Sequence, residues 1–522
     1  MATLQNDLWT HERLPLITTA VLSTATLLYM MTRNSYDSDT QKALDAIPTP
    51  KEGRYPYIGH LLNFISMQAH KLKQWHDELG PVIRVQMGAQ PWIVVSDPAI
   101  VHYLFVTKGA TASNRPYQVK STHYYSRDNS GIAFGNANAR WRRLRAVAAS
   151  TALSPLAVSQ NTGFIKSEAT RLVTELMSAT SNDDGVDPLR PFRRASVNYV
   201  FQTVFGTSIE TDDDPRLQSA LEFTDQTNML IGTHKDIDGF LPFMSLINKL
   251  AGRKKSKMLS DFLSKRDPFL RGLIRQALEG DKECMMKTLY SQQDALELKD
   301  TDLWVVAGDM VAGAATNVGY ASCWLLAILL HHQDVYKQLC EEVDAFIGKH
   351  GRLPDFSERD AFPLLISAQK ESMRFRGTND VTLPHLVEKD VYYQGYLFPR
   401  GVLVLPSAYA MHRNPERYPE PDKFIATRFL NNTETMASSA AGKVQERDHF
   451  MFGWGRRICP AMHLAEVQMF VLLTNVLARC DIKPPADSSL PDLDDGRDAG
   501  AVMSPPPFKL RFVKRENSLI DS

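Results

Sequence analysis

One long apolar stretch near the middle of the chain, residues 303–330, restricts the fold more than any other segment. It is hydrophobic almost all round, and such a helix has to be buried in a protein core or in a membrane. The helical pattern continues without a break past a few polar or small residues, which are Asp309, Gly313, Thr316 and Asn317. This continuity favours a buried core helix over a membrane span.

The rest of the chain is mainly helical in pattern, with a smaller strand-rich portion. Helical periodicity covers 61–79 and most of 141–331. Short β-branched runs predict strands at 82–87 and 92–95, joined as a hairpin, and at 391–396, 402–405 and 508–513. We therefore expect a mainly α fold with a smaller β portion (α+β), without internal repeats.

The N-terminal region differs from the body of the chain. Residues 14–31 contain no charge, and 18 such residues are near the lower limit for a helix that crosses a bilayer. A cleaved signal peptide is the alternative, but no basic region precedes the segment and no clear cleavage site follows it. Prolines stiffen the stretch after it. We expect a single N-terminal transmembrane helix within an anchor at 1–33, a polar and proline-rich neck at 34–56 and a catalytic domain at 57–522.

Charge and cysteine content exclude several classes of protein. Lys+Arg and Asp+Glu both number 59, so no overall field points to nucleic acid as a partner. The five cysteines are odd in number and widely spaced, with no CxxC or zinc pattern. This pattern argues against a disulfide scaffold and fits a body kept in a reducing compartment.

The most informative segment surrounds Cys459, in the sequence FGWGRRICPAMHLAE of residues 452–466. Its glycines permit a tight turn, and Pro460 opens a predicted apolar helix. A thiolate at a helix N-terminus is stabilised by the helix dipole and by free N–H groups, which also tune sulfur as a metal ligand. Arg457 supplies a guanidinium for a nearby anion.

This segment resembles the heme-binding loop of the cytochrome P450 family, Phe-x-x-Gly-x-Arg-x-Cys-x-Gly. Phe452, Gly455, Arg457 and Cys459 match that pattern, and Ala461 replaces its last glycine. The resemblance implies the cytochrome P450 fold and heme b (iron protoporphyrin IX), with Cys459 as the metal ligand. The continuation after Cys459 is most similar to fungal microsomal members.

Two further motifs occur in the order that this resemblance requires. Glu371 and Arg374 match the family's Glu-x-x-Arg helix, and Arg428 matches its third partner. The resemblance implies a buried ion cluster with a structural role. Trp141 and Arg145 match a Trp-x-x-x-Arg helix that binds a heme propionate. His385 lies where many members place a propionate-binding Arg or His, although it could equally be a structural histidine.

The long apolar helix resembles the family's oxygen-activating helix, whose pattern is Ala/Gly-Gly-x-Asp/Glu-Thr. The resemblance places Gly313 beside the cofactor and Thr316 at the oxygen site, but Ala315 stands at the acidic position. Dioxygen cleavage needs protons, so Asp309, two helical turns before Thr316, or Asn317 with ordered water would have to assist. Asp309 could instead anchor substrate or be a satisfied buried group.

The resemblance implies a monooxygenase that hydroxylates a steroid, terpenoid, polyketide or fatty acid. NADPH-cytochrome P450 reductase, with cytochrome b5 as a possible second donor, would supply electrons at the endoplasmic reticulum membrane. Family topology places the substrate near residues 117–130, Asp309, Ala312, 378–383 and 501–503. Two alternatives stay open: a heme-thiolate isomerase or dehydratase of an oxygenated lipid, because of Ala315, and a non-enzymatic membrane-tethered heme-binding protein.

Overall fold

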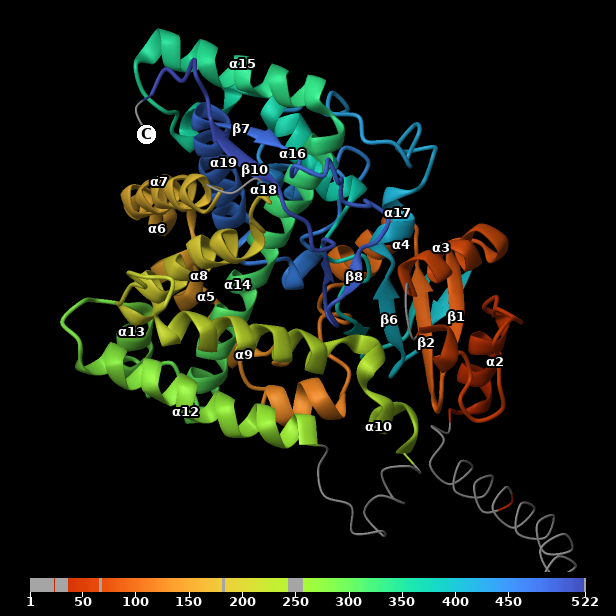
Figure 1. The fold of residues 1–522 in the computed structure, drawn as a ribbon. Helices are drawn as coiled ribbons and strands as arrows, with labels where there is room; N and C mark the ends of the chain where they lie inside the picture. Colours follow the sequence, from red (N-terminus) through yellow and green to blue (C-terminus); the bar gives the residue numbers. More distant parts are fainter. Residues whose placement is uncertain (1–22, 24–35, 65–67, 181–183, 243–256, 521–522) are drawn as a thin grey trace, which may run out of the picture.

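The computed structural model describes residues 23, 36–64, 68–180, 184–242 and 257–520. A large helical part lies beside a smaller part that contains the main sheet (Figure 1). The α-helices are α2 (Ser38–Ala46), α3 (Gln68–Leu79), α4 (Pro98–His102), α5 (Ala139–Ala148), α6 (Pro155–Gln160), α7 (Thr162–Ala179), α8 (Leu189–Phe205), α9 (Pro215–Ile231), α10 (Ile237–Phe240), α12 (Lys257–Glu279), α13 (Met285–Ser291), α14 (Asp300–His331), α15 (Gln333–His350), α16 (Pro363–Phe375), α17 (Ala408–His412), α18 (Met436–Ala441) and α19 (Met462–Arg479).

Short tight or wide helical turns connect these helices. They are η1 (Leu61–Phe64), η2 (Tyr103–Thr107), η3 (Val119–Tyr125), η4 (Ala149–Leu153), η5 (Thr233–Lys235), η6 (Phe356–Ala361) and η7 (Gly455–Arg457). The strands are β1 (Val82–Met87), β2 (Gln90–Val95), β3 (His385–Leu386), β4 (Val391–Tyr393), β5 (Tyr396–Phe398), β6 (Leu403–Pro406), β7 (Cys480–Lys483), β8 (Arg497–Asp498), β9 (Met503–Ser504) and β10 (Arg511–Lys514).

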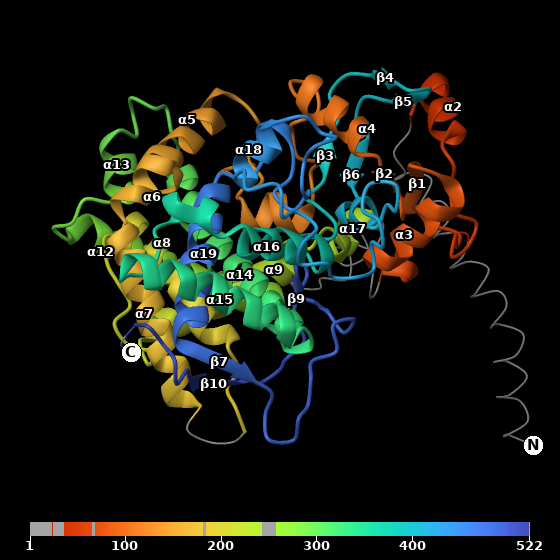
Figure 2. The same ribbon diagram turned by 90° about the horizontal axis from the view of Figure 1, so that it is seen from above.

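Helix α14 is the centre of the helical part, as the apolar run predicted. It packs against α8, α9, α12, α16 and α19, and its label lies among the helices in both views (Figures 1 and 2). Among the described residues it is the one helix long and apolar enough to cross a membrane, and 83% of its apolar window is buried inside the protein. It is therefore a core helix, and burial of its whole circumference explains its composition.

The main sheet has the strand order β1-β2-β6-β3. Strands β1 and β2 form the predicted antiparallel hairpin, and the two-residue connection begins at Gly88 with a φ of 56°. Strand β2 pairs with β6 in parallel, with Val94 opposite Leu405. Strand β3 then pairs with β6 in antiparallel orientation, with His385 opposite Val404.

The prediction of a single strand over 391–396 was wrong. Gln394 and Gly395 have φ values of 50° and 82°, so the chain reverses there and makes a hairpin of β4 and β5. Two successive residues with positive φ form the tight turn that matches strand twist. The predicted strand at 508–513 corresponds to β10, which pairs with β7.

Residues 14–31, where a transmembrane helix is expected, lie outside the residues that the structure describes, apart from Ser23. The following stretch is not an extended connection throughout. Helix α2 begins after Asp37, whose carboxylate accepts from the N–H groups of Asp39 and Thr40. Leu44 and Ile47 are 1% and 3% exposed. They belong to an apolar cluster that includes Val82, Ile93 and Val404 of the main sheet. Part of the predicted neck is thus packed onto the body.

Candidate active site

Cys459 lies at the end of a glycine-containing loop, three residues before α19 begins. Its N–H donates to the carbonyl of Phe452 over 2.8 Å, which closes the loop. Gly455 has a φ of 54°, and a Cβ atom there would lie 1.9 Å from the carbonyl oxygen of Phe105. Any other residue at position 455 would therefore displace the loop from η2.

The sulfur of Cys459 faces a cavity, whereas the other four cysteines are buried in packing positions. Burial raises the pKa of the Cys459 thiol, while the N–H of Ala461 and the charge of Arg145 act in the opposite direction. Because burial has the largest effect, the sulfur is not ionised by its surroundings alone. A metal cation would complete the deprotonation, since a coordinating thiol loses its proton.

The cavity has a volume of about 330 Å³ and lies between α14 and the cysteine loop. Its lining is mostly apolar, which is typical of ligand sites of this size. Phe452 lies beside Cys459 in the wall, and Met310, Val318 and Leu383 belong to the same lining. This is a mostly apolar site with one thiol.

Arg115, Arg145 and Arg457 add a cluster of positive charge to the same cavity. Their guanidinium groups donate to backbone carbonyls: Arg457 Nε to Ser113 over 2.7 Å, Arg115 Nη1 to Pro384 over 2.7 Å, and Arg145 Nη2 to Ile458. Within the described ranges, none of the three forms an ion pair with a carboxylate. We call these three residues the arginine cluster.

The arginine cluster is electrostatically uncompensated. Burial and then repulsion from Arg115 and Arg145 lower the pKa of Arg457 to about 8, and burial and then Arg145 lower that of Arg115 to about 9. Guanidinium groups are otherwise always charged in proteins, so these shifts indicate a need for negative charge beside the arginine cluster. An anionic ligand with carboxylates would satisfy it through charge-assisted hydrogen bonds.

Trp141 contacts the arginine cluster, and His385 lines the same cavity. The indole N–H of Trp141 donates to the carbonyl of Ile132 over 3.0 Å, and its ring lies 4.4 Å from the guanidinium carbon of Arg457. Trp141 thus lies behind the arginines and is not part of the cavity lining. His385 lines the cavity and stacks on Phe105 with ring centroids 3.8 Å apart.

His385 is held in one tautomer. Its Nδ1 lies 2.7 Å from the carbonyl of Ala112, and because a carbonyl only accepts, Nδ1 carries the hydrogen. Burial, followed by the charge of Arg115, lowers the pKa of His385 well below its ordinary value, so Nε2 is an acceptor. A carboxylate bound nearby would favour the protonated ring, in which both nitrogens donate.

The face that α14 presents to the cavity includes the predicted Asp309 and Gly313 but not Thr316. Its lining residues recur at helical spacing: Asp309, Met310, Gly313, Ala314, Asn317, Val318 and Ala321. Thr316 is 1% exposed and is turned toward α9, where its Oγ1 accepts from Asn228 Nδ2 over 3.1 Å. The structure therefore places Thr316 outside the cavity and Asn317 inside it.

Asn317 supplies a polar group to this face of α14, and Gly313 leaves space beside it. The Nδ2 of Asn317 donates to the carbonyl of Gly313 over 3.2 Å, which leaves its second hydrogen free. Its Oδ1 is buried without a hydrogen-bond partner among the described residues. A Cβ atom on Gly313 would meet no atom within 4 Å, so the space beside it belongs to the cavity.

Comparison with known proteins decides the family. The sequence model of cytochrome P450 matches residues 48–512. The chain belongs to the cytochrome P450 family. It is 26% identical over 489 residues to the cytochrome P450 monooxygenase virE of Hypocrea virens, covering 89% of this chain and 84% of that protein. It is 27% identical over 492 residues to the human steroid 17-alpha-hydroxylase/17,20 lyase, covering 91% and 92%.

Solved structures agree on the fold. A zebrafish cytochrome P450 solved with progesterone superposes with a TM-score of 0.72 at 23% identity, covering 85% of this chain and 99% of that one. Members of the family bind heme, and the family match with these relatives supports a monooxygenase. The residues present fit that cofactor, because a thiol and an uncompensated arginine cluster share one apolar cavity, as an iron porphyrin with two propionates requires.

Arg115 is the cavity residue that the sequence did not reveal. It stands in Ser-Asn-Arg-Pro, which resembles no heme motif used above. Its carbonyl partners, Leu383 and Pro384, lie 268 and 269 residues further along the chain. The only local signal is an arginine with no acidic residue nearby in the sequence, which is weak.

Asp309 lines the cavity but is fully engaged with the loop that precedes α5. Its carboxylate accepts from the hydroxyl of Tyr125 over 2.9 Å, from the N–H of Ile132 over 2.6 Å and from the N–H of Ala133 over 3.2 Å. Burial, which outweighs these bonds, raises the pKa of Asp309 to about 6. Asp309 thus fastens this loop to α14.

We expect Asp309→Asn to change how stability depends on pH. The pKa of Asp309 is higher in the folded protein, at about 6, than its ordinary value of 3.8 in the unfolded chain. The folded protein therefore loses stability as the pH rises from 3.8 through about 6, where the buried carboxyl group has to ionise. The neutral amide has no such loss, so its advantage over wild type should grow by about 2.4 kcal/mol between pH 4 and 7. Urea unfolding of both proteins across that range measures the difference in unfolding free energy. A difference that does not change with pH would contradict the raised pKa of Asp309.

Glu371, Arg374 and Arg428 meet away from the cavity, as the family resemblance implied. Glu371 is fully buried and accepts from Arg374 Nε over 2.7 Å and from Arg428 Nε over 2.9 Å. Its Oε1 also accepts from the N–H of Ile425 over 3.0 Å. None of the three touches the cavity, so they act on the fold.

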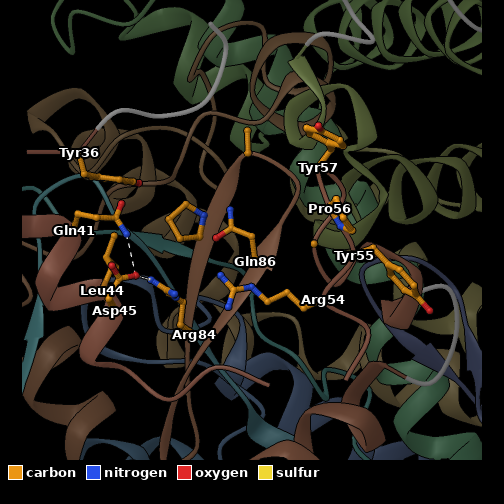
Figure 3. A pocket seen from close by; sticks show the side chains of 13 residues that line it. Tyr36, Gln41, Leu44, Asp45, Arg54, Tyr55, Pro56, Tyr57, Arg84 and Gln86 are labelled. Carbon is orange, nitrogen blue, oxygen red and sulfur yellow. Dashed lines mark hydrogen bonds and ion pairs between the residues drawn. The ribbon is translucent and has the colours of Figure 1, made fainter. Parts of the chain in front are cut away.

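A second pocket, between α2 and β1, is polar and separate (Figure 3). Asp45 accepts there from Arg84 over 2.7 Å and from Gln41 over 3.0 Å. It shares no lining residue with the cavity of Cys459. In the part of the chain described, no group of three or more His, Cys, Asp or Glu side chains could hold a metal ion.

Proposed function

We propose that this cytochrome P450 hydroxylates a hydrophobic small molecule, such as a steroid, terpenoid, polyketide or fatty acid. Electrons would come from an NADPH-dependent cytochrome P450 reductase, with cytochrome b5 as a second donor. The observation that carries the proposal is the meeting of Cys459 and the arginine cluster in one apolar cavity. The named activity of the mammalian relative, steroid 17-alpha-hydroxylase, favours a steroid among these classes.

Each cavity residue has a defined part in this proposal. Cys459 would bind the heme iron, and the arginine cluster with His385 would hold the propionates, while Phe452 and Gly313 would contact the porphyrin. When bound, heme supplies dioxygen activation and transfer of one oxygen atom into a carbon–hydrogen bond. The apolar lining excludes water, which protects that chemistry from side reactions.

Asn317 is the polar residue of α14 that serves the oxygen side of the cavity. Its second Nδ2 hydrogen would hold a water that delivers a proton on this side of the cavity. Thr316 and Asp309 have their polar atoms committed to Asn228 and to the loop before α5. This assignment replaces Thr316 by Asn317 as the positioning residue.

Asn317→Ala and Thr316→Val test that assignment as a matched pair. We expect Asn317→Ala to lower product formed per NADPH consumed by about tenfold, since one directed hydrogen bond is lost. Thr316→Val should leave this ratio within about twofold of wild type, because its side chain lies outside the cavity. The opposite result would return the role to Thr316.

The location of the enzyme is also part of the proposal. We infer an anchor at 1–33 in the endoplasmic reticulum membrane, with residues 57–522 as the cytosolic catalytic domain. The uncharged stretch 14–31 and the steroid hydroxylase relatives support it. Separation of cell membranes with and without residues 1–33 tests it, since a protein held by this anchor should become soluble when the anchor is removed.

A heme-thiolate isomerase or dehydratase is the second candidate. Whether Thr316 or Asn317 is aligned with the family's threonine, the residue before it, Ala315 or Thr316, is not acidic. Such an enzyme would rearrange an oxygenated lipid without external electrons. It would therefore turn over a fatty acid hydroperoxide in the absence of NADPH and reductase.

Turnover with and without NADPH and reductase separates these candidates. The heme-loaded chain is incubated with steroids and terpenoids, and in parallel with a fatty acid hydroperoxide, and products are identified by mass. Products one oxygen heavier that require NADPH and reductase support the monooxygenase. NADPH-independent rearrangement supports the isomerase. Bound heme with neither activity would support a non-enzymatic heme-binding protein.

A further inference from the structure

A small cavity of about 30 Å³ adjoins the cavity of Cys459, which we call the heme cavity. The two share Thr378 and Leu383 in their linings. Its walls come from separate elements, with Ala69 from α3, Trp92 from β2 and Met503 from β9. Most of its lining is apolar, so it extends the hydrophobic site toward β2 and β6 of the main sheet.

Close backbone packing fixes one wall of this cavity. Gly500 has a φ of 93°, and a Cβ atom there would lie 2.2 Å from the carbonyl oxygen of Asn228. A Cβ atom on Gly232 would lie 2.9 Å from the carbonyl carbon of Gly500. The segment after α9 and the turn before β9 therefore meet without space for side chains, and the wall is preformed.

Asp380 is the single ionisable residue in the lining of this cavity. Its carbonyl accepts from the N–H of Tyr409 over 2.9 Å, but its carboxylate has no hydrogen bond or salt bridge within the described residues. Burial raises the pKa of Asp380 to about 6, opposed by Arg413 and then Arg376. A carboxylate in a mostly apolar lining without protein donors is costly, and a ligand that donates would remove the cost.

The two neighbouring arginines do not supply those donors. Arg413 pairs with Asp422 over 2.9 Å and donates to the carbonyl of Phe375 over 2.9 Å. Arg376 pairs with Asp494 and donates to the carbonyl of Leu493 over 2.6 Å. Their charges remain close to Asp380, so a further cation would be repelled there while a neutral donor would not.

We propose that Asp380 binds a hydroxyl group of the substrate, and that the preferred substrates are hydrophobic alcohols. The hydroxyl would lie beside Asp380 while the apolar body passes Thr378 and Leu383 into the heme cavity. This inference rests on the proposed function and narrows its substrate class. Asp309, the carboxylate of the main cavity, is occupied by the loop before α5 and does not compete for this role.

Binding of matched probes to the heme-loaded full chain tests the proposal. The probes are dodecan-1-ol, dodecane and dodecyltrimethylammonium, with affinities taken from the Soret spin shift or from competition with a ligand that produces one. In Asp380→Val we expect the alcohol-to-alkane affinity ratio to fall by about tenfold, as loss of a hydrogen bond to a charged group predicts. Asp380→Asn, which still accepts a hydrogen bond, should keep the ratio within about threefold.

Asp494→Asn is the control, because it removes a carboxylate from the same neighbourhood without touching the cavity. It should leave the ratio unchanged. The proposal is overturned if Asp380→Val leaves the ratio unchanged, which would mean that only water occupies this cavity, or if the ammonium probe binds more tightly than the alcohol. Absence of a heme-thiolate spectrum from wild type would instead overturn the proposed function itself.

Discussion

Cys459→Ser should abolish the spectral signature of thiolate-ligated heme. Cys459 is the one cysteine that faces the cavity, and a serine hydroxyl does not ionise to replace a thiolate at neutral pH. The reduced protein is treated with carbon monoxide, and the Soret band is compared with that of wild type. We expect complete loss of the band position that is typical of a thiolate ligand.

Cys284→Ser is the matched control for this variant. Cys284 is buried at the N-cap of α13, away from the cavity, and serine is a favourable N-cap residue. Its spectrum should equal that of wild type. A thiolate band that survives in Cys459→Ser, or is lost in Cys284→Ser, would show that the iron ligand has been assigned to the wrong residue.

The cysteine loop could be predicted from the sequence because its chemistry is local. Phe452, Gly455, Arg457 and Cys459 lie within eight residues, and one loop conformation brings them together. The same applies to Glu371 and Arg374, which are one helical turn apart. Spacing along the chain was sufficient in both cases.

The register of α14 could not be predicted, since its small residues fit two alignments. Successive helical residues point about 100° apart, so an error of one position moves Thr316 out of the cavity and Asn317 into it. Distant contacts decide the register: Arg193 Nε donates to the carbonyl of Ala315 over 2.7 Å, and Ser196 Oγ to that of Ala314 over 2.9 Å. These partners on α8 are more than 100 residues away in sequence.

Asp309 illustrates a second limit of the sequence. Its position on the helix predicted a residue near the oxygen site, and it does line the cavity. Its function is set by Tyr125 and by two backbone N–H groups of a loop about 180 residues earlier. Side-chain type and spacing give no information about such partners.

Glu371→Gln should destabilise the enzyme by about 3–5 kcal/mol, because it leaves two buried guanidinium groups without their counter-charge. Arg374 is 1% exposed, and both arginines donate to the same carboxylate oxygen. The midpoint of urea unfolding, converted to a free energy, measures the loss. Glu341→Gln is the matched control, since its partner Lys337 is exposed and 3.9 Å away, and it should cost less than about 0.5 kcal/mol.

The same variant should also lower heme loading, although no member of the ion cluster reaches the cavity. Arg374 Nη1 donates to the carbonyl of His412 over 2.9 Å, and His412 Nε2 accepts from the N–H of Phe450 over 2.8 Å. Phe450 begins the segment that closes on Cys459, so the ion cluster holds the cysteine loop through His412. Equal stability and heme content in Glu371→Gln and Glu341→Gln would contradict this connection. Loss of stability with normal heme content would mean that the ion cluster stabilises the core but does not hold the cysteine loop.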